Sequence, residues 1–421
     1  MTQYHPTDPR LREYEAVVAG GGPAGATAAT LLAQRGHRVL LAERTAHPQF
    51  KLGESLMPAT YSTFERLGML EKMKRSHFPK KMSVQFVTAS GRESKPFYFF
   101  ENDPHERSQT WQVLRSEFDQ MLLDNAVEQG VEVCRGLSLK EGIFDGDRAV
   151  GARVKRVGGE PIEIRSQVLI DATGQSALLA RRMGIRHLEP QLKNASIYTH
   201  YEGARRDEGI DEGATIIYQT ESKRSWFWFI PLPGDRVSVG VVGSIDHLIR
   251  ERSADPRQTF EEELDRCPLL AERLAGAQQT MPVGVIRDFS YKTGQQAGEG
   301  WVLVGDAGGF IDPVYSTGVF LALKSGEMAA DAVHEAIESG DLSGERLGSF
   351  ATEYRAGVEA LRTLVYAFYR PDFSFARFLE RYPECRGQLV DMLVGNVYER
   401  PVDRILAALR ETLAEPVAAT A

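Results

Sequence analysis

Residues 14–44 read YEAVVAGGGPAGATAATLLAQRGHRVLLAER. The apolar run AVVA predicts a strand that leads directly into Gly20, Gly22 and Gly25, which have GxGxxG spacing. The alanine-rich stretch after the glycines predicts a helix, and the apolar run VLLA predicts a second strand that ends at Glu43. Glycines between a strand and a helix, with an acid at the end of the next strand, are typical of a dinucleotide-binding unit.

Each of these residue types has a physical role in such a unit. Gly20 permits the tight turn, Gly22 lets the backbone approach a pyrophosphate, and Gly25 lets the helix pack closely on the strand. The start of the helix offers backbone N–H groups to the phosphates, and Glu43 is placed to accept hydrogen bonds from a ribose. The predicted cofactor contacts in this unit are Gly20, Gly22, Pro23, Ala24, Gly25, Glu43 and Arg44.

The size and composition of the chain indicate a globular protein with more than one domain. A chain of 421 residues is too long for one ordinary core, and its 42% hydrophobic and 26% charged residues are normal for soluble proteins. The formal charge of −8 argues against nucleic-acid binding. The cysteines form no CxxC pair, no apolar run is long enough to span a bilayer, and the polar N-terminal segment lacks the apolar core of a signal peptide. We therefore expect a cytoplasmic protein.

Two later stretches also predict strands that end at a helix. Residues 301–333 read WVLVGDAGGFIDPVYSTGVFLALKSGEMAADAV, where a strand ends at Asp306 and a helix begins near Gly318. Asp306 at this junction can bind a ribityl hydroxyl, and the amides that open the helix can face a flavin pyrimidine. Residues 165–184 read RSQVLIDATGQSALLARRMG and predict another such strand. Arg115 precedes a helix in VLRSEFDQMLLDNA, and we expect it over the phosphates.

Together these segments resemble the FAD-binding core of the flavin monooxygenase superfamily over most of residues 12–335. The resemblance implies FAD as the cofactor and an α/β fold with three parts: a Rossmann-like FAD-binding domain of the glutathione reductase type, an antiparallel-sheet substrate domain and a helical C-terminal region. Alternating runs such as MSVQFVTASG and RVSVGVVGS predict the strands of the substrate domain. The predicted boundaries are 1–75 with 111–186 and 291–343 for the discontinuous FAD-binding domain, 76–110 with 187–290 for the substrate domain, and 344–421 for the helical region.

Three features narrow the resemblance to the flavin-dependent halogenases. Residues 226–231 read WFWFIP and match the WxWxIP motif of that family, and residues 310–318 read FIDPVYSTG and match its FxxPxxSxG motif at every fixed position. Lys81 follows the GES motif at 53–55, and Phe86 keeps the family's five-residue spacing from the catalytic lysine, which Lys80 does not.

This resemblance implies a two-component enzyme that uses O2, a halide ion and reduced FAD supplied by a separate flavin reductase. No second GxGxxG has a strand–helix context, which fits an enzyme without its own NADPH domain. Halide would be oxidised near the flavin, and the hypohalous acid would travel through a tunnel to Lys81, the expected catalytic residue. The residues expected at the halide site and tunnel are Ser316, Thr317, Gly318, Trp226 and Trp228, and the further expected FAD contacts are Ser55, Arg115, Asp306, Pro313 and Gly318. Ser316 and Thr317 are also expected to cap the helix that follows.

The pattern looks closest to halogenases that act on pyrroles or phenols, either free or tethered to a carrier protein. At the position before Ser316, where tryptophan halogenases carry a glutamate, this chain has Tyr315. That departure disfavours free tryptophan as the substrate. We expect an electron-rich aromatic substrate of the phenol or pyrrole type.

Other interpretations of the same residues stay open. The tryptophans of 226–231 alternate with phenylalanines, which is also the pattern of a strand buried on both faces. Lys80 and Lys81 are compatible with a solvated pair at a sheet edge. The aromatic-rich stretch 361–382 predicts a helical cover on the core, a wall of the substrate pocket or a carrier-protein docking surface.

Three other functions share the flavin motifs. An aromatic hydroxylase would transfer oxygen instead of halogen, and a flavin reductase of the geranylgeranyl reductase type would act on lipid-like alkenes. A flavin-binding protein without turnover would act as a sensor. No group of His, Cys and Asp residues has metal-ligand spacing, so no metal site is predicted.

Overall fold

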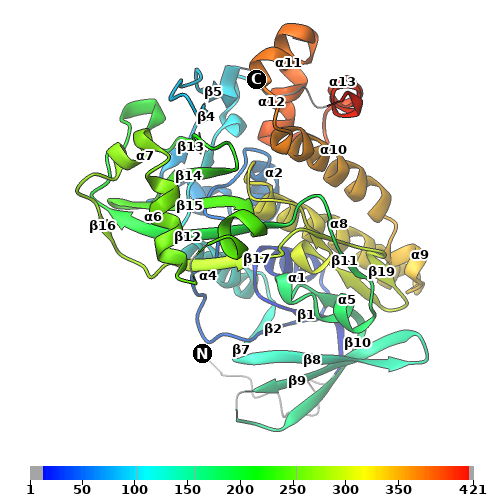
Figure 1. Cartoon of the computed structure of the whole chain (residues 1–421). Helices are drawn as coiled ribbons and strands as arrows, with labels where there is room; N and C mark the ends of the chain where they lie inside the picture. The colour runs from blue at the N-terminus through cyan, green and yellow to red at the C-terminus, as the bar shows by residue number, and fades with distance from the viewer. Residues whose placement is uncertain (1–12, 102, 157, 253, 417–421) are drawn as a thin grey trace.

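The computed structural model describes residues 13–101, 103–156, 158–252 and 254–416 (Figure 1). Residues 1–12, on which most of the expectation about a signal peptide rests, lie outside these ranges. Within the described ranges, no helix combines the length and apolar character that crossing a membrane requires.

The first sheet has eight strands, in the order β19-β20-β10-β1-β2-β7, with β9 paired to β10 and β8 paired to β9. Its strands are β1 (Glu13–Ala19), β2 (Val39–Glu43), β7 (Glu132–Arg135), β8 (Leu137–Asp145), β9 (Arg148–Arg156), β10 (Pro161–Asp171), β19 (Ala297–Gly298) and β20 (Trp301–Leu303). β1 runs parallel to β2 and β10, and β10 runs parallel to β20. The carboxyl ends of these strands therefore share one edge, where α/β folds bind their ligands.

Helix α1 (Pro23–Gln34) connects β1 to β2 and packs directly on helix α8 (Thr317–Ser339). The contact is close because a Cβ on Gly326 of α8 would lie 2.4 Å from the carbonyl oxygen of Ala24. The Ser325 hydroxyl of α8 also accepts a hydrogen bond of 2.8 Å from the Gly305 amide after β20. Segments from opposite ends of the FAD-binding core thus meet at the glycine-rich turn.

The second sheet also has eight strands, in the order β16-β12-β15-β14-β13-β4-β5, with β17 paired to β12. Its strands are β4 (Ser83–Val87), β5 (Phe97–Tyr98), β12 (Asn194–Glu202), β13 (Thr215–Gln219), β14 (Ser225–Pro231), β15 (Arg236–Ser244), β16 (Gln278–Gln279) and β17 (Gly284–Arg287). Neighbouring strands are antiparallel except β4 and β13, which run parallel. The prediction of an antiparallel sheet is therefore wrong for the pair β4 and β13. The reason is that β4 and β13 are joined through strands of the first sheet, so no hairpin imposes opposite directions on them.

Both faces of β14 are buried. Trp226 and Trp228 belong to the large core that also includes the flavin-motif helices and the C-terminal helices. Phe227 and Phe229 belong to a separate core, where the ring of Phe227 packs edge-to-face on Phe260. The alternation of the WFWF sequence therefore divides its side chains between two cores, because successive side chains of a strand point to opposite faces.

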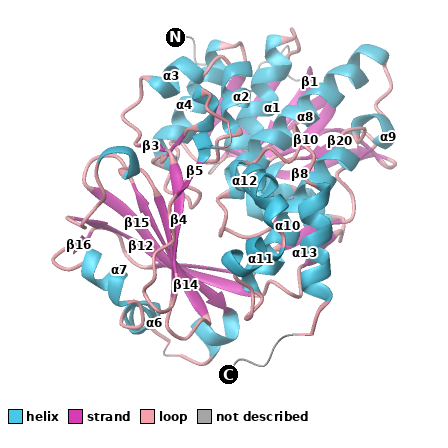
Figure 2. Cartoon of the chain, turned by 90° about the horizontal axis from the view of Figure 1, so that it is seen from above, coloured by secondary structure: helices cyan, strands magenta, loops and turns pink. Residues whose placement is uncertain are grey.

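Helices dominate the remaining structure, and Figure 2 shows the C-terminal ones beside the second sheet. They are α2 (Thr60–Arg66), α3 (Leu70–Lys74), α4 (Arg115–Glu128), α5 (Leu178–Arg182), α6 (Pro256–Leu264), α7 (Pro268–Arg273), α9 (Gly344–Leu347), α10 (Ala351–Tyr369), α11 (Phe375–Arg381), α12 (Arg386–Val394) and α13 (Asp403–Ala414). Two small sheets pair β3 (Lys80–Lys81) with β6 (Thr110–Trp111), and β18 (Tyr291–Thr293) with β11 (Arg186–Leu188) and β21 (Gly309–Phe310). Short turns of other helix types lie at Phe99–Glu101, Glu106–Ser108, Gly174–Ser176, Gly209–Asp211, Asp246–Arg250, Gly305–Ala307 and Pro383–Cys385.

Candidate functional site

The predicted site residues lie on or next to strands of both large sheets, on the small β3–β6 sheet and at the starts of three helices. The β1–α1 turn and the start of α1 contain Gly20, Gly22, Pro23, Ala24 and Gly25, and the end of β2 contains Glu43 and Arg44. Ser55 lies between β2 and α2, Lys81 lies on β3, and Arg115 begins α4. β14 carries Trp226 and Trp228, Asp306 follows β20, and the start of α8 with the segment before it contains Pro313, Ser316, Thr317 and Gly318.

The glycine-rich turn leaves open space at one position only among its three motif glycines. A Cβ on Gly20 would lie 2.2 Å from the Ala172 carbonyl oxygen, and a Cβ on Gly25 would lie 2.0 Å from the Gly20 carbonyl oxygen. A Cβ on Gly22 would meet no atom within 4 Å. Gly20 and Gly25 are therefore required by packing within the protein, whereas the space beside Gly22 is available to a ligand.

Glu43 is held as a carboxylate beside this turn. Burial raises the pKa of its carboxyl group, but hydrogen bonds from Thr45 and from the Gly21 amide outweigh burial and lower the pKa overall. The Gly21 amide donates to Oε2 at 2.7 Å, and Thr45 donates to Oε1 through its amide at 2.9 Å and its hydroxyl at 2.7 Å. A fixed carboxylate at the end of β2 has the acceptor chemistry that a ribose needs. The Arg44 side chain beside it is exposed.

Asp306 and Arg115 lie near each other at the carboxyl edge of the first sheet. Burial raises the pKa of Asp306 to about 6, and the positive charge of Arg115 opposes that rise. The Arg115 guanidinium is itself buried, pairs with Asp119 at 2.9 Å and donates to the Leu52 carbonyl oxygen at 2.5 Å. Open space at Gly22, a ribose acceptor in Glu43 and a carboxylate at Asp306 together fit the pyrophosphate and the two sugar-like chains of FAD.

Lys81 is buried, so its interpretation as a solvated edge residue is wrong. Its side chain is 4% exposed, and Nζ donates hydrogen bonds to the Ser55 hydroxyl at 2.9 Å and the Leu56 carbonyl oxygen at 3.1 Å. Nζ also lies 5.7 Å from the centre of the Phe99 ring. Among the described residues no acid pairs with this amine, so burial lowers the pKa of Lys81 to about 7. Lys80, the next residue on the same strand, points to solvent.

The hydroxyl that holds Lys81 belongs to a residue expected to contact FAD. Ser55 Oγ lies 2.9 Å from Thr215 Oγ1 on β13, and Gln112 Nε2 donates to the same Thr215 oxygen at 2.9 Å. All of these side chains are buried. The GES motif therefore fixes the lysine through hydrogen bonds that reach the second sheet, and Ser55 has a partner that sequence reasoning did not assign to it.

Ser316 occupies the N-cap position of α8, but its hydroxyl makes no capping hydrogen bond. The expectation that Ser316 caps the helix through its side chain is therefore wrong. The reason is its left-handed backbone, with φ 59° and ψ 25°, whereas capping side chains normally belong to extended residues. A non-glycine residue in this conformation is strained, and such strain gathers at functional sites.

Sequence reasoning missed Asp312, which lies inside the FxxPxxSxG motif. Its carboxyl group is fully buried and accepts hydrogen bonds from the Tyr369 hydroxyl at 3.0 Å, Asn194 Nδ2 at 3.2 Å and the Val314 amide at 3.0 Å. Burial raises the pKa of Asp312 to about 7. The Tyr369 hydroxyl in turn accepts a hydrogen bond of 3.1 Å from Trp226 Nε1. One chain of hydrogen bonds thus joins the two halogenase motifs through helix α10.

Aromatic rings from β4, β14, α10, α11 and the turn before α8 meet around this network. The ring of Phe368 packs on Trp226 and Tyr315, at centroid distances of 5.8 and 5.9 Å. The ring of Phe375 packs on Tyr315 at 6.4 Å and on Phe86 at 5.5 Å. The aromatic residues of the C-terminal helices therefore contact the residue five positions after Lys81 and the motif tyrosine, rather than a remote part of the core.

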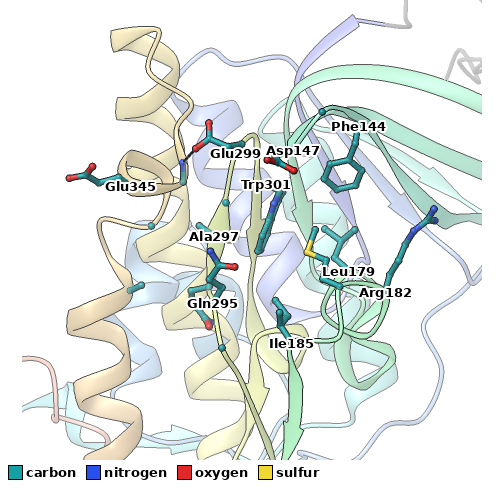
Figure 3. A pocket seen from close by; sticks show the side chains of 18 of the residues that line it. Phe144, Asp147, Leu179, Arg182, Ile185, Gln295, Ala297, Glu299, Trp301 and Glu345 are labelled. Atoms are coloured by element: carbon teal, nitrogen blue, oxygen red, sulfur yellow. Dashed lines mark hydrogen bonds between the residues drawn. The ribbon is translucent and has the colours of Figure 1, made fainter.

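A separate cavity of about 940 Å³ lies on another part of the molecule, among β8, β19, β20, α5 and α9 (Figure 3). Trp301, Phe144, Arg182 and Glu299 contribute to its wall. None of the predicted flavin, halide or tunnel residues lines it. Its volume therefore has no bearing on the assignment of the site described above.

Comparison with known proteins decides the family. A model of the FAD binding domain matches residues 13–357. The 1H-pyrrole-2-carbonyl-(peptidyl-carrier protein) brominase of Pseudoalteromonas luteoviolacea is 34% identical over 393 residues, which cover 92% of this chain and 93% of that protein. The chain belongs to the flavin-dependent halogenases.

Two further halogenases have the same overall structure. The flavin-dependent brominase Bmp2 is 29% identical with a TM-score of 0.84, and the match covers 95% of this chain and 98% of that one. The myxobacterial chondrochloren halogenase CndH is 30% identical with a TM-score of 0.80, covering 96% and 97%. The fold is thus that of an FAD-dependent halogenase with a helical C-terminal region, as predicted, and FAD is its cofactor.

The burial of Lys81 in this halogenase has a measurable cost in stability. Holding an amine with a pKa of about 7 instead of 10.5 costs up to about 4 kcal/mol at pH 7. Lys81→Met removes this cost but leaves two acceptors without a donor, which costs about 1–2 kcal/mol. We expect the variant to be more stable than the wild type by about 2 kcal/mol at pH 7.

The sign of the pH dependence follows from the lowered pKa. Between pH 7 and 10.5 the unfolded chain binds a proton at Lys81 that the folded chain does not, so wild-type stability rises with pH in this window. The advantage of Lys81→Met should therefore shrink toward pH 10.5 in urea unfolding experiments. An advantage that does not change with pH would contradict a buried, mostly neutral amine.

Tyr369→Phe tests the hydrogen bonds between the two halogenase motifs. The change keeps the ring but removes the hydroxyl that joins Trp226 to Asp312. We expect the free energy of unfolding to fall by about 1–2 kcal/mol, with a change in tryptophan fluorescence. The matched control is Tyr218→Phe, because the Tyr218 hydroxyl is buried and has no hydrogen-bond partner among the described residues. Equal losses in both variants would show that the network has no stabilising role.

Proposed function

We propose that this halogenase uses Lys81 to transfer halogen to an electron-rich aromatic substrate of the pyrrole or phenol type. Bound reduced FAD, supplied by a separate reductase, provides the oxidising chemistry that converts O2 and halide into hypohalous acid. The neutral amine of Lys81 then attacks the halogen, forms an N–X bond and releases water after proton transfer. The aromatic carbon takes the halogen from nitrogen and loses its own proton, which regenerates the amine.

The observation that supports this proposal is the environment of Lys81. Its amine is held by two neutral acceptors, Ser55 Oγ and the Leu56 carbonyl oxygen, with no carboxylate as a partner. A pKa of about 7 leaves a substantial fraction of neutral amine near neutral pH. Nucleophilic lysines depend on such a lowered pKa.

Halide and oxidant would be handled by the elements beside the flavin. The residues proposed for the halide site are Ser316, Thr317 and Gly318. The amides of Thr317 and Gly318 lie in the first turn of α8, where N–H groups have no helical partners. The Ser316 amide already donates to the Pro313 carbonyl oxygen at 3.0 Å, so the next two amides are the proposed halide donors. The indoles of Trp226 and Trp228, whose ring centres are 6.3 Å apart, are proposed to wall the passage from flavin to lysine. An apolar wall would limit the loss of hypohalous acid to side reactions.

The names of two relatives favour a carrier-bound pyrrole within this substrate class. The brominase described above and a chlorinase from Pseudomonas fluorescens, 29% identical over 96% of this chain, are both named for 1H-pyrrole-2-carbonyl groups on a peptidyl-carrier protein. Tyr315 stands where tryptophan halogenases carry a glutamate, and its hydroxyl is buried without a hydrogen-bond partner among the described residues. We therefore propose a substrate delivered as a thioester rather than a free amino acid.

The direct test supplies purified protein with FAD, a flavin reductase, NADH, O2 and bromide. Pyrroles and phenols, free and as carrier-bound thioesters, are screened by mass spectrometry, and free hypobromite is trapped in parallel. A brominated pyrrole or phenol supports the proposal. Oxygenated product without hypobromite would favour a hydroxylase instead.

The pH profile separates two routes at Lys81. If the neutral amine forms an N–X bond, turnover rises as pH rises through about 7, because the ammonium loses its proton. If an ammonium instead donates a hydrogen bond to hypohalous acid, turnover falls over the same range. We expect the rise, measured as product per hypobromite formed so that effects on the flavin reaction cancel.

A further inference from the structure

Two histidines and a glutamate meet where the turn after α1 contacts the end of α8. His37 Nε2 lies 2.8 Å from His334 Nδ1, the centres of the two rings are 5.1 Å apart, and the angle between the ring planes is 62°. The carboxylate of Glu338 completes a group whose ligand atoms all lie within 4.8 Å of one another. The two histidines are separated by 297 residues in the chain, so only the packing of α1 on α8 brings them together.

The local geometry holds these ligand atoms close together. His334 and Glu338 are four residues apart on α8, so they lie on the same face of the helix. His37 Nδ1 lies 3.0 Å from Glu15 Oε1, and Glu15 Oε2 accepts a hydrogen bond of 2.8 Å from the Arg38 amide. A carboxylate at Nδ1 places the proton there, which leaves the lone pair of His37 on Nε2, facing His334. Carboxylates behind metal-bound histidines have this role.

We propose that His37, His334 and Glu338 bind a divalent transition metal such as Zn2+, with water at the remaining position. Two imidazoles and one carboxylate are a donor set that zinc accepts and that magnesium and calcium disfavour. Zn–N bonds of about 2.0–2.1 Å in a tetrahedron require the two nitrogens to be about 3.3 Å apart. Metal binding therefore requires the present 2.8 Å contact to open by about half an ångström.

Exposure and charge also suit metal entry. His37 is 6% exposed, while His334 is partly exposed and Glu338 is exposed, so the site opens to solvent on the α8 side. Glu338 has no ion-pair or hydrogen-bond partner among the described residues, and its carboxylate is available to the metal. The bound ion would tie the turn before β2 to the end of the helix that begins at the proposed halide site.

The test titrates Zn2+ alone into the full chain, loaded with FAD and freed of chelators and purification tags, by isothermal calorimetry. We expect one tight equivalent for the wild type and its loss in His334→Gln and Glu338→Gln. Glu15→Gln should weaken binding by about 10-fold, the low end of the effect of carboxylates behind metal-bound histidines. His77→Gln is the matched control, because His77 is exposed and its ion-pair partner is Glu117, at 3.1 Å, far from the proposed ligands in the chain.

The outcomes separate the proposal from simpler explanations. Thermal midpoints measured without metal establish that His334→Gln and Glu338→Gln are folded, and only the wild type should gain stability on adding Zn2+. Unchanged affinity and stoichiometry in both variants would overturn the proposal and leave His37 and His334 as a hydrogen-bonded pair. Loss of the tight equivalent in His77→Gln would overturn it as well, by placing the metal elsewhere. The measurement requires neither substrate nor halide, so it stands apart from the test of halogenation.

Discussion

Lys81→Met is expected to abolish halogenated product while hypohalous acid continues to form. Methionine fills a similar volume in the buried site but has no nitrogen to accept halogen. We expect product formation to fall by about 1000-fold or more, equivalent to about 4 kcal/mol of lost transition-state stabilisation. The measurement compares product and trapped hypobromite in the same reaction, with the flavin reductase in excess.

Lys80→Ala is the control for this experiment. Lys80 is adjacent to Lys81 on β3, but its side chain is exposed. The control should keep full product formation, because removing an exposed lysine leaves the amine of Lys81 in place. If Lys81→Met retains product, or if hypobromite disappears together with product, the relay through Lys81 is wrong.

Gly22→Val is expected to remove FAD binding without unfolding the protein. A Cβ at Gly22 meets no protein atom within 4 Å, and its backbone, with φ −74° and ψ −178°, suits any residue. The new side chain would occupy the space that the pyrophosphate needs beside the start of α1. We expect the affinity for FAD to fall by about 100-fold or more, equivalent to about 2.7 kcal/mol.

The control for this variant is Gly294→Val. Gly294 also has room for a side chain, since its nearest neighbour would be His187 Nε2 at 4.0 Å, but it lines the separate cavity of Figure 3. FAD affinity is measured by fluorescence titration, and stability by thermal unfolding of the FAD-free proteins. Normal FAD binding by Gly22→Val would exclude this turn as the pyrophosphate site. A large loss of stability would instead show that Gly22 is a packing residue like Gly20 and Gly25.

The strand–helix junctions and the family could be predicted from the sequence because their signals are local. Gly20 and Gly25 are needed by contacts within one turn, and the predicted strand end at Glu43 agrees with the structure. The predicted strand end at Asp306 is wrong, because β20 ends at Leu303 and the backbone turns into a short 3-10 helix at Gly305–Ala307. The resemblance to the family also predicted the helical C-terminal region. The domain boundaries and the roles of individual site residues stay predictions.

Other features were missed because they depend on contacts between distant segments. The parallel pairing of β4 with β13 follows from the path of the chain through the first sheet, which no local pattern records. Ser316 was expected to cap α8 with its side chain, but its backbone is left-handed and its hydroxyl makes no capping hydrogen bond. Lys80 and Lys81 are the same residue type at adjacent positions, and only the folded strand buries Lys81 and exposes Lys80.

By itself, the sequence determined the dinucleotide turn, the flavin fold and the halogenase motifs, because glycine, proline and aromatic residues act over a few positions of backbone. Only the tertiary structure decided the chemical state of the side chains. Lys81 acquires a pKa of about 7 from burial, Asp312 acquires Tyr369 as a partner from helix α10, and His37 meets His334 across the α1–α8 contact. Desolvation and hydrogen bonding depend on neighbours in space, and for these residues the neighbours are up to 297 positions away in the chain.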